Sequence, residues 1–275
     1  MRLEPDKWII NVIKDYVAEI IIFLIVPTVA VSVFFLPQNI KNSLKLDLLR
    51  FNVINFYTSV FTHGNFIHLI SNLTSYYIYT SLSYCLSRLS NKKTWFLKCY
   101  LIFFLILPLI NNFSLIILNK YYLGGKLPPS CGLSGIISAI LGLTPISLFV
   151  FLKKSGAQLN LEKFMLLIIC SSVLLISYSY KHIFLLLITV AILLVSIILG
   201  RKELKSIYRL IKEMPLQDIS SYFLAIITIS LYFVGVIVIF PNTIIVNGNV
   251  VDIISHYLGW TMGLFIPDLL LKIVK

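Results

Sequence analysis

The 275-residue sequence predicts an all-α fold, a polytopic membrane helix bundle of about eight transmembrane helices with both termini cytoplasmic. Three observations predict this class. The chain is 59% hydrophobic and only 12% charged, whereas a soluble domain carries about 25% charged residues. Its apolar residues gather in long runs, and its basic residues lie between those runs. Helices are expected because a helix satisfies its own backbone hydrogen bonds where water is absent.

Eight apolar runs approach the length of about 20 residues that a spanning helix needs. In chain order they cover residues 18–36, 65–87, 95–118, 132–152, 162–180, 183–200, 219–240 and 250–270. Only Lys181 and His182 separate the fifth run from the sixth. We therefore interpret residues 162–200 as an extra helix pair, a hairpin whose turn lies at the membrane surface.

Two segments do not have the composition of a span. Residues 1–17 mix charges with apolar residues and lack the basic, apolar and cleavage regions of a signal peptide. We expect them to be retained as a cytoplasmic N-terminal segment. Residues 37–64 are too polar to span but hold many aromatic and aliphatic side chains. They are interpreted as a membrane-associated loop in the interface.

The orientation follows from Lys and Arg, which favour cytoplasmic loops. With a cytoplasmic N-terminus, the eight spans place seventeen Lys and Arg inside and six outside. Treating 162–200 as one crossing would move the basic loop 201–217 outside, so we reject that alternative. The net charge of +12 is spread over loops between apolar runs rather than over one soluble face. We therefore expect the lipid bilayer, and no nucleic acid, as a partner.

The cysteines predict neither a metal site nor a disulfide framework. Their spacing matches neither kind of pattern, and they are scattered in or beside apolar runs, at Cys85, Cys99, Cys131 and Cys170. We interpret each one as a small buried hydrophobic residue. No metal or cofactor is expected.

Polar residues recur at one predicted depth. His68, Ser134 and His256 lie near the starts of the second, fourth and eighth runs, which all begin at the outer face in this topology. At about 1.5 Å per helical residue, all three would lie within roughly 10 Å of that face. Ionisable groups in hydrocarbon are costly and are usually functional. Their shared depth therefore indicates a site.

The chemistry of these residues suits a hydrolase. A serine hydroxyl becomes an effective nucleophile when a neighbouring base accepts its proton, and His256 is the candidate base for Ser134. Acyl transfer also needs donors for the developing oxyanion. His68 and Asn72 lie one helical turn apart on one face and could supply two donors, and the Ser134 amide a third. The glycines beside Ser134 would let a substrate backbone approach closely.

Structural roles explain each residue when it is taken singly. Ser134, Ser138 and Gly142 form a stripe of small residues, as do Gly259 and Gly263. Such stripes are typical of closely packed membrane helices.

The remaining polar residues also have structural interpretations. His68 and Asn72 could bond to a neighbouring helix. We interpret His63 and His182 as solvated or hydrogen-bonded bystanders. Asp252 is expected to cap the last helix at its start.

The ordered combination of "FTHGNFIHLISN", "GLSGIISAILG" and "DIISHYLGWTMG" resembles the rhomboid family of intramembrane serine proteases. The family pattern is matched in three parts, at His68 and Asn72, at Gly132, Ser134 and Gly135, and at His256, Gly259 and Gly263. The resemblance covers roughly residues 50–152 and 250–270. It implies one rhomboid-like integral membrane domain over residues 1–275.

The resemblance also implies an activity, a serine endopeptidase that cuts membrane proteins within or beside a transmembrane segment. Ser134 would be the nucleophile and His256 the general base and acid, without a third carboxylate. His68, Asn72 and the Ser134 amide would stabilise the oxyanion. The protein would be multi-pass in the cell membrane, with an active site that opens toward the extracytoplasmic side, and residues 240–250 would form a movable cap.

The chain departs from the family pattern in four places. Three predicted helices, rather than one, separate the serine helix from the histidine helix. Position 138 is Ser where an aromatic is common, and Arg50-Phe51 stands in place of a Trp-Arg pair. A common glutamate is missing from the second helix. We interpret the chain as a divergent member.

Two other functions compete with the protease hypothesis. One is a catalytically weak or inactive rhomboid-like protein that binds membrane clients, which loss of Ser134 or His256 would favour. The other is a small transporter, which inverted repeats or charges at mid-bilayer would favour. The sequence has neither feature clearly.

Overall fold

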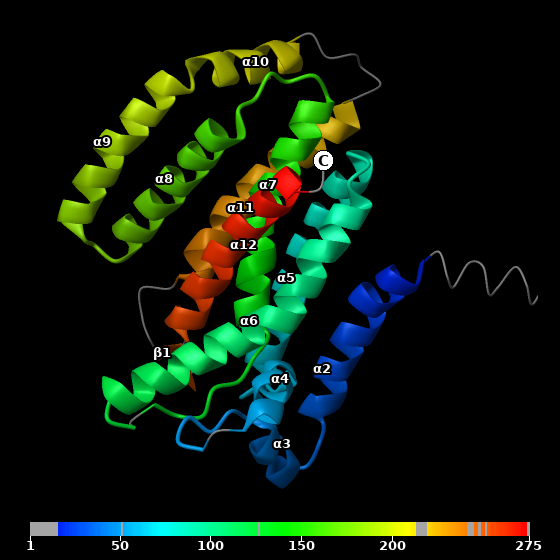
Figure 1. Ribbon diagram of the computed structural model, residues 1–275, viewed down its shortest axis with the longest axis vertical. Coiled ribbons are helices and arrows are strands. Elements are labelled where there is room, and N and C mark those ends of the chain that lie inside the picture. Colours follow the sequence, from blue (N-terminus) through cyan, green and yellow to red (C-terminus); the bar gives the residue numbers. More distant parts are fainter. Residues whose placement is uncertain are drawn as a thin grey trace, which may run out of the picture.

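A computed structural model describes residues 16–50, 52–125, 127–212, 219–240, 245–246, 249–250 and 252–273 (Figure 1). The described chain is a helical bundle. Its elements are the π-helix η1 (Ile21–Ile25), α2 (Val26–Phe34), α3 (Gln38–Leu44), α4 (Val53–Phe61), α5 (Phe66–Leu89), α6 (Lys93–Tyr121), α7 (Ser134–Lys154), α8 (Leu161–Ser179), α9 (Ile183–Leu199), α10 (Arg201–Lys212), α11 (Ile219–Ile239), β1 (Ile245–Val246), β2 (Asn249–Val250) and α12 (Ile253–Ile273). The two strands form a short antiparallel pair.

Several helices have the length and composition of membrane spans, so this is a polytopic helical membrane protein. Within the described ranges, five meet both criteria, namely Tyr16–Phe34, Lys93–Tyr121, Ser134–Lys154, Leu161–Ser179 and Tyr222–Ile239. A sixth is added if α9 and α10, bent by 64°, count as one span. A long helix lies over each of the eight predicted runs. Polar residues such as His68, Asn72 and His256 lower the apolar character of α5 and α12, so the count of eight crossings remains a prediction.

Helix α7 is the centre of the bundle. Every residue from Gly135 to Leu152 is buried. The helices α5, α6, α11 and α12 pack around it (Figure 1). A helix that is apolar all round is stable only when other helices or lipid cover it, and here other helices do.

Backbone contact joins α7 to α12. A Cβ atom added at Gly259 would lie 2.1 Å from the Gly135 carbonyl oxygen, and one at Gly263 would lie 2.1 Å from the Ala139 carbonyl oxygen. A Cβ at Gly142 would lie 2.4 Å from the Trp260 carbonyl oxygen. Only glycine fits at these positions. The predicted close packing through these small residues is confirmed.

Residues 37–64 contain two short helices, α3 and α4, rather than only a loop. Asn55 Nδ2 donates to the Lys45 carbonyl oxygen over 2.8 Å, which ties α4 to the segment before it. An isolated β-bridge pairs Leu46 with Ser130. This segment therefore holds the chain that leads into α7.

The pair α8 and α9 forms the predicted helical hairpin. Lys181 at its turn has a φ of 56°. Helix α8 packs against α11 and α7, whereas α9 packs chiefly on α8, at the side of the bundle (Figure 1). Tyr232 on α11 links the hairpin to α12, because its hydroxyl lies 2.9 Å from Ser172 Oγ and accepts from Trp260 Nε1 over 3.2 Å.

Two predicted segments lie largely outside the described residues. Of the N-terminal segment 1–17, the structure describes only Tyr16 and Val17. Of the predicted cap, residues 240–250, it describes Phe240 and the two short strands.

Candidate functional site

An open cavity of about 710 Å³ lies among the starts of α5, α7 and α12. Among its lining residues are His68, Ser71, Asn72, Ser134, Ile137, Ile239, Asp252 and His256. All four predicted site residues are in this group, although they come from three separate helices. The structure therefore brings His68, Asn72, Ser134 and His256 together around one space.

The start of α5 positions its two polar residues. Asn65 caps the helix by accepting a hydrogen bond from the His68 backbone N–H over 2.8 Å. His68 then lies in the first turn and Asn72 one turn later on the same face. Asn72 is buried, and its Nδ2 has no hydrogen-bond partner among the described residues. That donor is free to bind a ligand in the cavity.

Gly132 fits against both side chains of α5. A Cβ atom at this position would lie 2.9 Å from His68 Nε2 and 3.4 Å from Asn72 Nδ2, and its φ is +122°. Any other residue would clash with the imidazole and strain the backbone. Gly132 therefore makes room for His68 and Asn72, and Gly135 for Asn111 and α12. Close approach of a substrate backbone at these glycines stays a prediction.

Ser134 is the first residue of α7. The first N–H groups of a helix have no acceptor within that helix, and the N-terminus carries a partial positive charge. Ser134 therefore stands at a helix end whose backbone donors favour an anion. The hydroxyl of Ser138 donates to the Ser134 carbonyl oxygen over 2.8 Å, so Ser138 has a structural role.

His256 has a defined tautomer. Its Nδ1 lies 2.7 Å from the Ile239 carbonyl oxygen at the end of α11. A carbonyl can only accept, so Nδ1 carries the proton and Nε2 keeps its lone pair. Within the part of the chain that the structure describes, Nε2 and Ser134 Oγ have no hydrogen-bond partner, including each other. His256 is thus held in the form that can accept a proton.

His63 supports His68 from the turn before α5. The two imidazole rings are T-shaped with centroids 5.1 Å apart, and His63 Nδ1 donates to the Phe61 carbonyl oxygen over 3.2 Å. Burial, together with the neighbouring His68, lowers the pKa of His63 to about 4, so this ring is neutral at pH 7. The bystander interpretation missed this contact. His182, by contrast, is exposed at the α8–α9 turn.

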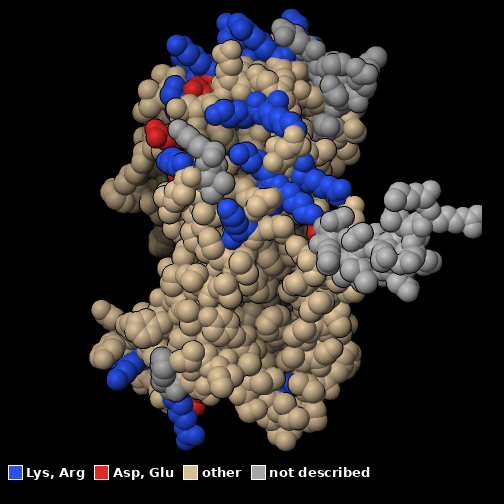
Figure 2. Space-filling model, turned by 45° about the vertical axis from the view of Figure 1, so that its right-hand side comes forward, with Lys and Arg blue, Asp and Glu red and all other residues tan. Residues whose placement is uncertain are grey.

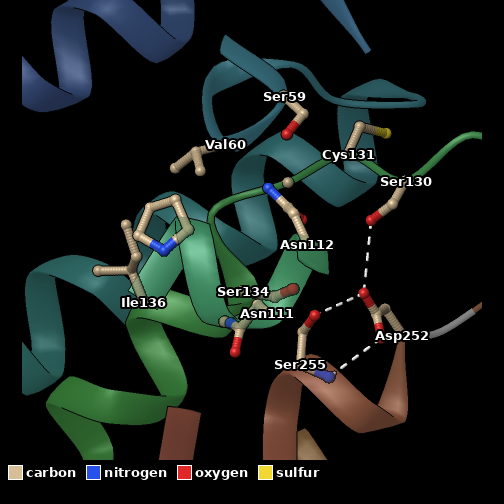
Figure 3. A pocket seen from close by; sticks show the side chains of 13 residues that line it. Ser59, Val60, Asn111, Asn112, Ser130, Cys131, Ser134, Ile136, Asp252 and Ser255 are labelled. Atoms are coloured by element: carbon tan, nitrogen blue, oxygen red, sulfur yellow. Dashed lines mark hydrogen bonds between the residues drawn. The ribbon is translucent and has the colours of Figure 1, made fainter. Parts of the chain in front are cut away.

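A second, smaller cavity of about 30 Å³ is also lined by Ser134 (Figure 3). Asn111 and Asn112 of α6 line it, and sequence reasoning missed both. Asn112 Nδ2 donates to the Phe56 carbonyl oxygen over 2.8 Å, whereas the buried Oδ1 of Asn111 has no described partner. The sequence feature that could have indicated these residues is the adjacent pair of asparagines in an otherwise apolar run.

Asp252 caps α12 as predicted. Its Oδ1 accepts from the Ser255 backbone N–H over 3.0 Å, and its Oδ2 accepts from Ser255 Oγ over 2.6 Å. Oδ2 also accepts from Ser130 Oγ over 3.4 Å (Figure 3). One carboxylate therefore connects the start of the histidine helix to the chain that leads to Ser134.

Other reactive groups near the site do not form a competing centre. Burial raises the pKa of the Cys131 thiol, which keeps it protonated and a poor nucleophile. Across the described ranges, no three His, Cys, Asp or Glu side chains gather as metal ligands would.

Comparisons with known proteins identify no relative. No protein-family model, curated protein or solved structure matches the chain.

Proposed function

We propose that this protein is an intramembrane serine endopeptidase of the rhomboid type, which cleaves membrane proteins that have a transmembrane helix. One observation carries the proposal. Ser134, His256, His68 and Asn72, which lie far apart in sequence, line a single cavity at the ends of three helices. This set contains a nucleophile, a base and oxyanion donors, the groups that acyl transfer requires.

In the proposed reaction, Ser134 Oγ attacks the scissile carbonyl carbon and His256 Nε2 takes the hydroxyl proton. Asn72 Nδ2, the Ser134 amide and His68 stabilise the oxyanion. When the C–N bond breaks, Nε2–H returns the proton to the leaving amine. A water molecule then attacks the acyl-serine, gives its proton to Nε2, and the carboxyl product leaves as Ser134 regains its hydrogen.

The hydrogen bond from His256 Nδ1 to the Ile239 carbonyl supports this role. In serine proteases with a triad, an aspartate holds the imidazole in the tautomer that leaves Nε2 free. Here a backbone carbonyl performs that orienting task. Because this hydrogen bond fixes the tautomer, the proposed dyad needs no third side chain for that purpose. Unlike an aspartate, the carbonyl adds no full negative charge.

Charge asymmetry supports the proposed location, a multi-pass protein of the cell membrane with both termini cytoplasmic. The visible face of the molecule carries most of its Lys and Arg at one end (Figure 2). The cavity lies at the starts of α5, α7 and α12, which the distribution of basic residues predicts to be extracytoplasmic.

One observation favours a second candidate function, a catalytically weak or inactive protein that binds membrane clients. Ser134 Oγ and His256 Nε2 are not hydrogen-bonded to each other among the described contacts. Catalytic hydrogen bonds often tighten only when substrate binds, so the protease remains the leading proposal. Cleavage itself distinguishes the two functions.

The test is cleavage of a single-pass membrane substrate by the purified protein in detergent, with the products identified by intact mass. We expect a cut within or beside the transmembrane segment, and no cut by Ser134→Ala. Ser138→Ala, one turn further along α7, is the matched control and should retain cleavage. Equal cleavage by the wild type and Ser134→Ala would contradict the proposal. Substrate that is retained by the wild type but never cut would favour client binding.

Asn72→Ala is expected to lower the rate of cleavage about 10²–10³-fold, the usual effect of removing one oxyanion donor. Its thermal stability should change little, because Asn72 Nδ2 bonds to no described residue. Asn112→Ala is the matched control. It loses the bond to Phe56 and should lower stability by about 1 kcal/mol. The Asn72 role is wrong if Asn72→Ala loses stability but keeps its rate.

A further inference from the structure

Helix α9 locates one membrane boundary. Of its seventeen residues only Thr189 and Ser196 are buried, and most of its exposed side chains are large and aliphatic. Such a helix must lie in lipid. Directly after Gly200 the chain bends by 64° into α10, which runs across the end of the bundle in Figure 1. Helix α10 therefore starts where the hydrocarbon core ends.

One face of α10 is fixed to the protein. Ile207 and Leu210 pack against the hydrophobic core. Ser206 Oγ accepts a hydrogen bond from the Gln158 backbone N–H over 2.7 Å. The sequence interpretation of 201–217 as a loop was therefore wrong for residues 201–212. The apolar residues of this segment recur with the spacing of a helix, but its many charged residues made that pattern hard to recognise in the sequence.

The charges of α10 are sorted between its two faces. Its single acid, Glu203, is only 7% exposed and forms an ion pair with Lys163 over 3.2 Å. The exposed charges are all basic, namely Arg201, Lys202, Lys205, Arg209 and Lys212. None of these five forms an ion pair with any residue that the structure describes. The outer face thus carries uncompensated positive charge.

Apolar groups border this basic face. Leu204 and Tyr208, one helical turn apart, are 42% and 65% exposed. A helix with a basic stripe beside exposed Leu and Tyr has the composition of a helix that lies in the membrane interface.

We propose that α10 is an interfacial helix that binds the headgroups of anionic phospholipids. Position and charge together carry this inference. The basic side chains are attached to a helix that starts at the end of a lipid-facing helix, so phosphate groups of the adjacent leaflet are the anions nearest to them. A soluble polyanion would need no exposed Leu204 and Tyr208, and no neighbouring apolar helix. The binding does not depend on the proposed proteolysis.

The test is competition between two lipids. The purified protein in mild detergent is mixed with equimolar phosphatidylglycerol and phosphatidylcholine, captured, and its retained lipid is measured by mass spectrometry. We expect phosphatidylglycerol to be enriched, and the enrichment to fall as NaCl rises. The variant with Lys202→Gln, Lys205→Gln and Arg209→Gln should lose about tenfold or more of that enrichment.

The matched control removes three exposed charges elsewhere in the chain, Arg50→Gln, Lys120→Gln and Lys181→Gln. It should keep the enrichment, and thermal unfolding should show that both triple variants are folded. Unchanged enrichment in the α10 variant, or an equal loss in both variants, would overturn the proposal. It would also be overturned if the α10 substitutions weakened binding of a short RNA while leaving phosphatidylglycerol retention unchanged.

Discussion

His256→Ala is expected to slow the labelling of Ser134 by a fluorophosphonate probe about 10²–10⁴-fold, the contribution of a positioned general base. The probe reacts with the serine oxygen only as its proton leaves. In the structure, the His256 imidazole lines the cavity, and its Nδ1–H donates a hydrogen bond to the Ile239 carbonyl oxygen. Removing it leaves the Ser134 hydroxyl proton without its proposed acceptor.

His182→Ala is the matched control for this experiment. His182 is exposed at the α8–α9 turn and lines neither of the two cavities. Its loss should leave the labelling rate unchanged. Labelling is followed by gel fluorescence over time, and the labelled residue is identified by peptide mass. Undiminished labelling of Ser134 in His256→Ala would show that another group activates the serine and would remove the dyad.

Gly259→Val is expected to prevent α12 from docking on α7, with a loss of stability of more than about 3 kcal/mol. The new Cβ would lie 2.1 Å from the Gly135 carbonyl oxygen, and backbone atoms cannot yield as a flexible side chain can. The helices must separate, which moves His256 away from Ser134. We therefore expect both a lower unfolding temperature and the loss of probe labelling.

Thr261→Val provides the control for Gly259→Val. Thr261 lies two residues further along α12 and is exposed, so a β-branched side chain already occupies that position. This variant should unfold at the wild-type temperature and label normally. The close-packing argument fails if Gly259→Val is as stable as Thr261→Val.

The positions of the long helices could be predicted from hydropathy because lipid imposes a minimum length on every apolar run. The hairpin at 162–200 was also predictable, since two residues suffice for a turn. The short helices α3 and α4 were not. They depend on contacts with distant residues, such as the hydrogen bond from Asn112 Nδ2 of α6 to the Phe56 carbonyl oxygen of α4.

The proximity of His68, Ser134 and His256 could be predicted because polar groups in apolar runs are few and their depths follow from the spans. The direction in which each side chain faces could not be predicted. His63 is buried beside His68 although it precedes the helix, and of the two adjacent asparagines of α6 it is Asn111 that lies against Gly135. A sequence gives the depth of such residues, while the rotation of each helix about its axis depends on packing.

The hydrogen bond between His256 and Ile239 has a further consequence. Ile239 is the last residue of α11, so the proton on the imidazole is fixed by the end of a different helix. A displacement of α11 would remove the acceptor and leave the ring free to rotate. The orientation of the His256 ring therefore depends on how α11 and α12 are placed relative to each other. A displacement at that junction would disable the proposed base while Ser134 stays in place.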